Sequence, residues 1–122
     1  MFWSELAGVP ETKWYIVAED ERQILGYAGL MTVGADADVQ SIAVSREARR
    51  SGLGRRLLVE LLEVARRRGG TRMFLEVAAD NVAAIGLYEL NGFEVTSRRR
   101  DYYAAGLDAI LMRRSLEDSV VE

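Results

Sequence analysis

The stretch RRSGLGRRLLVEL, Arg49 to Leu61, combines two glycines one residue apart with a cluster of arginines, directly ahead of a helical pattern. Leucine and alanine recur at helical spacing, which predicts a helix from Leu53 to Arg68 that a Gly-Gly pair ends. A glycine turn between a strand and a helix is a recurrent anion site, because unpaired backbone amides and the positive end of the helix dipole point at the same place. The stretch therefore predicts an α/β fold with an anion bound where this helix begins.

Two well-known phosphate motifs do not fit this stretch. A GxGxxG pattern would need a third glycine where Leu57 stands, and a P-loop would need Lys followed by Ser or Thr. The pattern that remains is R-x-x-G-x-G, with Arg49, Gly52 and Gly54 at its fixed positions. Residues 46–72 hold nine arginines and three glutamates, a local charge of +6 in a chain of net charge −3. An anion is expected here, and a solvated helix face with counter-ions is the alternative.

The rest of the chain predicts a mixed sheet. Six strands are expected, over residues 14–19, 24–32, 39–44, 71–79, 93–98 and 107–114. The first two flank the polar turn DERQ as an antiparallel hairpin, and the fourth reads as an interior strand covered on both faces. A second helix is expected over residues 82–90 with Asp80 or Asn81 as its cap, and RDYYAAG connects the last two strands. The order β-β-β-α-β-α-β-β makes the first helix a parallel crossover.

Length and composition narrow the function classes. At 122 residues, 49% hydrophobic and 29% charged, the chain reads as one globular domain spanning residues 1–122. No apolar run approaches the roughly 18 residues that cross a bilayer, and no signal peptide pattern is present, so we expect a cytoplasmic protein. The absence of Cys and His excludes disulfides, thiolate nucleophiles, cysteine zinc sites and a Ser-His-Asp triad, and we expect no metal. Proton transfer falls to Asp, Glu, Tyr, Lys13 or water.

These motifs together resemble a known family. R-x-x-G-x-G after a strand resembles the pyrophosphate loop of the GNAT superfamily, the acetyl-coenzyme A dependent N-acetyltransferases. LEVAADNVAAIGLYELNGF, residues 75–93, is similar to the second half of the coenzyme site in the RimI-type protein N-terminal acetyltransferases. FWSE, RRRDYY and DAILMRR resemble further segments of that subfamily, so nearly the whole chain is covered.

The resemblance implies a GNAT fold, a mixed and mostly antiparallel sheet with a parallel βαβ crossover at the coenzyme site. Members of the family normally begin with another strand and much of a helix before the W-S segment, whereas Met1 stands almost directly ahead of it here. We therefore expect the N-terminal strand and helix to be missing, and a partner or a dimer to cover the exposed sheet edge.

The resemblance also implies acetyl-coenzyme A as cofactor and coenzyme A as product. In the family, backbone amides of the loop hold the pyrophosphate, the preceding strand lies along the pantetheine arm, and an asparagine before the next helix contacts the coenzyme. A backbone amide near Val44 would polarise the thioester carbonyl. Carried onto this sequence, the cofactor-binding residues are Ile42, Ala43, Val44, Arg49, Arg50, Ser51, Gly52, Leu53, Gly54, Arg55, Asn81 and Tyr88.

Two residues are candidates for proton transfer. Glu76 lies in the apolar run MFLEVAA, where burial would raise the pKa of its carboxyl. The resemblance implies that Glu76 is the general base, acting through a water, and that Tyr88 is the general acid that protonates the departing thiolate. The alternatives are an ion pair of Glu76 with Arg72 or another arginine, and a packing role for Tyr88.

The acceptor implied by the resemblance is the N-terminal α-amine of a protein, a ribosomal protein that begins with alanine. A neutral α-amine costs roughly 3.5 kcal/mol less to form near neutral pH than a neutral lysine amine, which suits a weak base. Tyr102, Tyr103 and Asp108 are expected to line the groove for the first residue, with ordinary strand packing as the alternative for the tyrosines.

Other interpretations stay open. The chain could acetylate a small-molecule amine, or bind coenzyme A or a protein partner without catalysis. A third alternative is that the arginine runs at residues 66–68 and 98–100 hold RNA. Few aromatic residues on which bases could stack alternate with these arginines, and the net charge of the chain is negative. We expect neither a nucleic acid nor a membrane as partner.

Overall fold

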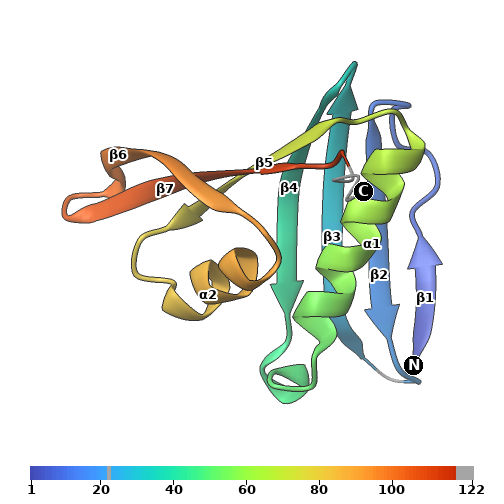
Figure 1. The fold of residues 1–122 in the computed structure, drawn as a ribbon. Coiled ribbons are helices and arrows are strands. Elements are labelled where there is room, and N and C mark those ends of the chain that lie inside the picture. The colour runs from blue at the N-terminus through green and yellow to red at the C-terminus, as the bar shows by residue number, and fades with distance from the viewer. Residues whose placement is uncertain (22, 118–122) are drawn as a thin grey trace, which may run out of the picture.

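The computed structural model describes residues 1–21 and 23–117, and within them one sheet carries two α-helices (Figure 1). The sheet has seven strands in the order β1-β2-β3-β4-β5-β7-β6. The strands are β1 (Phe2–Glu5), β2 (Lys13–Glu19), β3 (Ile24–Val33), β4 (Asp36–Val44), β5 (Arg72–Ala78), β6 (Glu94–Ala104) and β7 (Leu107–Ser115). The helices are α1 (Leu53–Arg67) and α2 (Val82–Leu90), with a short 3-10 turn η1 (Arg46–Ala48) ahead of α1.

The strand pairing explains where the sheet opens. Neighbouring strands pair antiparallel except β4 and β5, which are parallel and joined through α1, as the sequence predicts. The parallel ladder runs only from Asp36 and Arg72 to Asp38 and Phe74. Beyond that pair the two strands diverge (Figure 1). In the described part of the chain, no strand pairs with the β5-facing edge of β4 after Asp38.

Helix α1 packs on the sheet through its leucines. Leu57, Leu58 and Leu61 are fully buried in the same cluster as the strand residues Trp14 and Leu30. Full burial of one such side chain stabilises the fold by roughly 1.5–3 kcal/mol. The close approach of α1 also depends on a glycine in β3. A Cβ at Gly26 would lie 2.7 Å from the Ala43 carbonyl oxygen and 3.2 Å from the side chains of Leu53 and Leu57.

The end of α1 follows the prediction closely. The helix ends at Arg67, and Gly69 has a φ of 86°. The amide of Gly69 donates to the Arg66 carbonyl at 3.0 Å, and the amide of Gly70 donates to the Ala65 carbonyl at 2.8 Å. These two bonds form a Schellman cap, which glycine favours because its backbone adopts the left-handed conformation without strain.

The N-terminal half contains more strand than the sequence predicts. Residues Phe2–Glu5 form β1 at one edge of the sheet, paired with the end of β2. Strand β4 begins at Asp36 rather than at Val39, because the β3 and β4 hairpin pairs as far as Val33 and Asp36, next to its turn. The predicted hairpin of β2 and β3 is confirmed, although Arg22 of its turn lies outside the described residues.

The C-terminal half corrects two further expectations. Strand β6 continues to Ala104, so Tyr102 and Tyr103 lie in the strand and not in a connection. Strand β5 is not covered on both faces: Met73, Leu75 and Val77 are buried, whereas the side chains that alternate with them are not. Every helix found in the described residues is too short or too polar to span a membrane.

Candidate active site

A cavity of about 650 Å³ lies beside the diverging strands β4 and β5. Its walls come from the end of β4, the loop that leads into α1, the first turn of α1, and α2. The lining residues are Ile42, Ala43, Val44, Ala48, Arg49, Arg50, Gly52, Leu53, Gly54, Asn81, Ala83, Ala84, Leu87 and Tyr88. The structure thus brings together all of the predicted cofactor residues except Ser51 and Arg55.

The N-terminus of α1 faces this cavity without a side-chain cap. Gly52 is the N-cap with a φ of 83°, and as a glycine it supplies no side-chain hydrogen bond to the first turn. The carbonyl of Gly52 accepts the Arg56 amide at 3.1 Å, which starts the helical ladder. The amides ahead of Arg56 have no carbonyl partner within the helix and are available to an anion. A Cβ at Gly54 would lie 3.4 Å from Leu87 of α2 and 3.7 Å from Val44 of β4, so both side chains lie beside this first turn.

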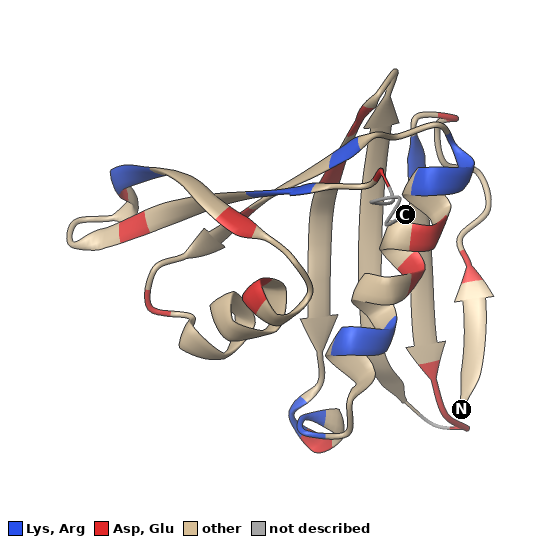
Figure 2. Cartoon of the chain, in the orientation of Figure 1, with Lys and Arg blue, Asp and Glu red and all other residues tan. Residues whose placement is uncertain are grey.

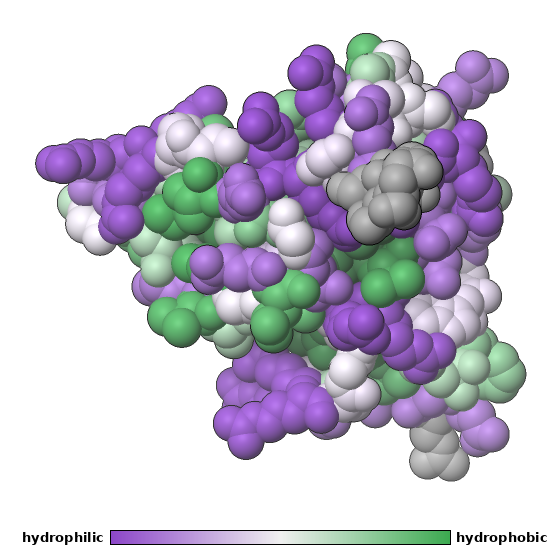
Figure 3. Space-filling view, in the orientation of Figure 1, coloured by the Kyte–Doolittle hydropathy of each residue, from purple (hydrophilic) through white to green (hydrophobic). Residues whose placement is uncertain are grey.

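The polarity of the cavity changes along its length. Figure 2 shows Lys and Arg residues gathered at the turn after β4 and on the first turns of α1. Arg49 and Arg50 are exposed and line the cavity there. Figure 3 shows hydrophilic residues projecting at this end of the molecule, next to hydrophobic ones. Further in, Ile42, Val44 and Leu87 supply apolar walls. The cavity therefore suits an elongated ligand with one anionic end.

Two predicted residues of α2 contribute to the cavity. Asn81 is the N-cap, and its side-chain oxygen accepts the Ala84 amide at 3.2 Å, which confirms the predicted cap. Tyr88 is only 5% exposed and packs edge-to-face on Phe93, with ring centroids 5.8 Å apart. Burial raises the pKa of Tyr88 to about 12. The phenol therefore stays protonated at neutral pH and can serve as a proton donor.

Glu76 lies on the face of β5 that does not pack into the core, and the expectation that it is buried is wrong. Its neighbours Leu75 and Val77 point into the core, so the alternation of the strand directs Glu76 to the open face, where it is exposed. Glu76 is also not paired with Arg72, whose Nε donates to Asp36 at 2.5 Å. The Glu76 carboxylate instead accepts the Tyr103 hydroxyl at 3.1 Å.

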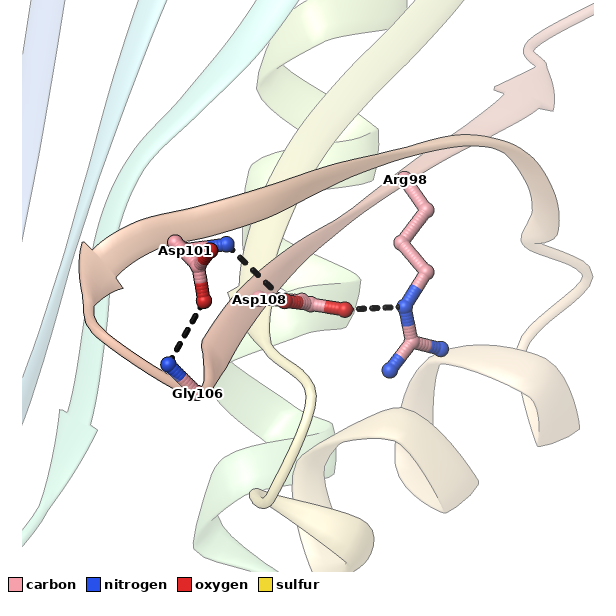
Figure 4. A network of polar contacts seen from close by, with 4 residues as sticks. All are labelled: Arg98, Asp101, Gly106 and Asp108. Carbon is pink, nitrogen blue, oxygen red and sulfur yellow. Dashed lines mark hydrogen bonds and ion pairs between the residues drawn. The ribbon is translucent and has the colours of Figure 1, made fainter.

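Tyr102, Tyr103 and Asp108 lie together in the last hairpin. The two tyrosine rings pack edge-to-face 5.2 Å apart, and both side chains are about half exposed. The Asp108 carboxylate accepts Arg98 Nε at 2.5 Å and the Asp101 amide at 2.9 Å (Figure 4). The Arg98 hydrogen bond, together with the Asp101 amide, lowers the pKa of Asp108. Asp108 is thus occupied by groups of its own hairpin.

Two cofactor candidates lie outside the cavity, and four lining residues are absent from the sequence prediction. The Ser51 hydroxyl donates to the Ala48 carbonyl. Arg55 lines a smaller hollow beside Trp3. The guanidinium of Arg56 lies over the Trp3 ring in the same region. The unpredicted residues are Ala48, Ala83, Ala84 and Leu87. Helical spacing from Tyr88 would have identified Ala84, four residues earlier, and Leu87 follows three residues after Ala84, because residues three or four apart lie on one side of a helix.

Comparison with known proteins gives consistent matches. Residues 2–93 match the model of the acetyltransferase (GNAT) family. The chain is 41% identical over 109 residues to the N-alpha-acetyltransferase RimI of Mycobacterium tuberculosis, covering 85% of this chain and 67% of that protein. The crystal structure of the ribosomal-protein-S18-alanine N-acetyltransferase from Escherichia coli superposes with a TM-score of 0.83 at 33% identity, over 92% of this chain and 74% of the other.

Two further matches set the limits of the comparison. An aminoglycoside 6'-N-acetyltransferase, whose structure contains coenzyme A, has a TM-score of 0.77 over 91% of this chain and 77% of the other, but at 17% identity it shares the fold alone. An uncharacterized protein of Mycobacterium leprae is 43% identical over 108 residues, and the chain spans only 29% of it. The chain thus corresponds to a part of these longer proteins.

Proposed function

Because the chain belongs to the GNAT family of acetyltransferases, we propose that it transfers an acetyl group from acetyl-coenzyme A to the N-terminal α-amine of a protein. The acceptor in this proposal is a ribosomal protein that begins with alanine, in line with the names of its RimI-type relatives. The single observation that carries the proposal is the cavity beside the diverging strands, which combines an uncapped helix N-terminus with Tyr88.

The residues of the cavity fit acetyl-coenzyme A. The amides at the start of α1, with Arg49 and Arg50 nearby, suit a diphosphate. The unpaired edge of β4 beyond Asp38 offers backbone donors and acceptors to an extended, amide-containing arm. The coenzyme supplies the activated thioester, and the protein supplies orientation and proton transfer. Asn81 and Leu87 of α2 close the other side.

The two candidate proton-transfer residues come from different elements, Tyr88 from α2 and Glu76 from β5. Tyr88 reaches the cavity from α2, and its raised pKa keeps it protonated for donation to a departing thiolate. Glu76 lies on the open face of β5, next to the strand divergence, and its exposed carboxylate suits a base that takes a proton through water. In this proposal the acceptor amine approaches from the face of β5 that carries Glu76, while the coenzyme occupies the cavity beside α1 and α2.

The proposal is tested by thiol release from acetyl-coenzyme A in the presence of a peptide that begins with alanine. We expect turnover with the free N-terminus, none with the same peptide acetylated at its N-terminus, and little with a peptide whose only free amine is a lysine. A second set of assays uses small amines, such as a polyamine, as acceptors in place of the peptides. Turnover with these amines and not with peptides would replace the proposed acceptor class.

Glu76→Gln is the variant that tests the base. General-base catalysis contributes about 10²- to 10⁴-fold, so kcat/KM should fall by about a hundredfold or more while coenzyme affinity stays unchanged. Glu94→Gln is the matched control, because Glu94 is also an exposed strand glutamate but belongs to β6 and lines a different hollow, with Arg72 and Arg113. Equal turnover of Glu76→Gln and the native protein would remove Glu76 from its role.

A further inference from the structure

Asp38 lies on the same face of the sheet as Glu76. It forms the last pair of the parallel ladder with Phe74, and paired residues point to the same face. Phe74 alternates with the buried Met73 and Leu75 of β5, so this face is the one that does not pack into the core. Glu76 follows Phe74 by two residues, which is roughly 6.5 Å along a strand. The two carboxylates therefore belong to the two strands that separate here (Figure 1).

The surroundings of the Asp38 carboxylate are largely apolar. Met31 of β3 stands opposite Asp38 on one side and Phe74 of β5 on the other, and all three residues are partly buried. The Arg72 guanidinium on this face is engaged by Asp36, to which its Nε donates at 2.5 Å. Within the described part of the chain, no hydrogen bond or ion pair reaches the Asp38 carboxylate.

An unpartnered carboxylate in this position favours a cation. Burial raises the pKa of Asp38, and the charge of Asp36 raises it further. Both effects mean that the ionised carboxylate lacks a compensating positive charge. The α-amine of a peptide has a pKa of roughly 7.7–8.0, so it is mostly protonated at neutral pH. An acceptor of the proposed class thus supplies the charge that Asp38 lacks.

We propose that the Asp38 carboxylate binds the protonated α-amine of the acceptor beside the strand divergence. The inference deepens the proposed function and rests on it, because the acceptor is the N-terminus of a protein. Asp38 holds the amine from the β4 side as the acceptor arrives, and Glu76 on β5 then takes the proton through water. Asp38 is thus a binding residue, and Glu76 remains the base. Because the contact is made with the charged amine, it strengthens binding of the acceptor more than it speeds the transfer.

Asp38→Asn tests the proposal, with Asp36→Asn as its matched control. Both variants remove one negative charge from the same face of β4 at nearly constant shape, whereas the Asp36 carboxylate is already paired with Arg72. Loss of a charge-assisted hydrogen bond should raise KM for an alanine-starting peptide about tenfold in Asp38→Asn, with kcat and KM for acetyl-coenzyme A within about threefold. Asp36→Asn should leave the peptide KM within about threefold. An unchanged peptide KM in Asp38→Asn, or a fall in kcat alone, would overturn the proposal.

A binding cycle tests the contact without turnover. Dissociation constants are measured, with coenzyme A present, for the alanine-starting peptide and for the same peptide with a propionyl group in place of its alanine, which lacks only the amine. The native protein should bind the amine form about tenfold more tightly. Asp38→Asn should bind both forms equally, because the partner of the amine is gone. Equal binding of the two forms by the native protein, or an unchanged preference in Asp38→Asn, means that Asp38 does not bind the amine.

Failure of this inference is distinguishable from failure of the proposed function. Absence of turnover with any peptide N-terminus would reject the proposed function, and the binding cycle still decides the role of Asp38. Turnover by the native protein, with the same amine preference in the native protein and in Asp38→Asn, would reject this inference alone.

Denaturant unfolding checks that the effects come from the acceptor and not from the fold. Asp38→Asn should keep the native midpoint or exceed it, because it removes a partly buried charge that has no partner among the described residues. Asp36→Asn loses its ion pair with Arg72 and should not exceed the native midpoint. A midpoint of Asp38→Asn clearly below that of the native protein would mean that Asp38 is paired within the protein, which contradicts the proposal.

Discussion

Asp38 of β4 and Phe74 of β5 form the last pair of the parallel ladder, and the sheet divides immediately after them. This single relationship places three features of the proposed site in one region. It exposes the β4 edge, it leaves room for the cavity beside α2, and it puts Glu76, two residues after Phe74, next to the opening. Both halves of the site thus depend on where β4 and β5 stop pairing.

The first prediction concerns the start of α1. Gly52→Ala should lower the unfolding free energy by about 1 kcal/mol, because Gly52 has a φ of 83° that a Cβ strains. It should also weaken binding of acetyl-coenzyme A by roughly five- to tenfold, since the strain shifts the helix amides. Gly8→Ala is the control: its φ is 75°, an added Cβ likewise meets nothing within 4 Å, and it lies far along the chain from the site. Equal coenzyme affinity of the two variants by calorimetry would contradict this account.

The second prediction separates the hydroxyl of Tyr88 from its ring. Tyr88→Phe keeps the packing on Phe93 and should change the unfolding free energy by less than about 1 kcal/mol. Loss of the proposed general acid should lower kcat by about a hundredfold. Phe93→Leu should do the reverse, lowering stability by about 1 kcal/mol while leaving kcat within a few fold. Steady-state kinetics and denaturant unfolding of the two variants check this pair.

The third prediction follows from the raised pKa of Tyr88. The unfolded tyrosine ionises near pH 10, whereas the folded one ionises near pH 12. Between these values the unfolded state has lost a proton that the folded state retains, so the unfolding free energy falls as pH rises. The loss attributable to Tyr88 should be about 2 kcal/mol from pH 10 to pH 12. The unfolding free energy of Tyr88→Phe is measured over the same pH range, and subtracting it isolates the contribution of Tyr88. Identical pH profiles of the variant and the native protein would exclude the raised pKa of Tyr88.

The fourth prediction concerns the capping role of Asn81 and its proposed contact with the coenzyme. Asn81→Ala removes the bond to the Ala84 amide and should lower the unfolding free energy by about 1 kcal/mol. Asn81→Ser retains a capping oxygen and should restore most of that stability. If the amide also contacts the coenzyme, both variants should bind acetyl-coenzyme A less tightly than the native protein. Native affinity in Asn81→Ser would restrict Asn81 to its capping role.

The central region of the fold was predictable because its signals are local. Helical periodicity from Leu53 onward, the Gly69 and Gly70 cap and the Asn81 cap each depend on residues close in the chain. The strand β1 carries no comparable signal, because four residues cannot show a clear alternation and its partner is β2.

The acceptor side was harder to predict because it depends on contacts between distant residues. The apolar composition of MFLEVAA does not reveal that only one face of β5 is covered, so Glu76 was expected in the core. The position of Tyr103 depends on a bulge that hydrogen bonds of Asp101 and Asp108 hold. Neither feature has a sequence pattern of its own, since register and bulges are properties of paired strands.

The central claim is that the start of α1 holds the diphosphate of the coenzyme. A crystal structure of the protein with coenzyme A tests it most directly. The account predicts diphosphate oxygens within hydrogen-bond distance of the backbone amides of Gly52 to Arg55, and the pantetheine arm along Ile42 to Val44. A coenzyme bound elsewhere, with these amides bonded to water or to the protein itself, would contradict it.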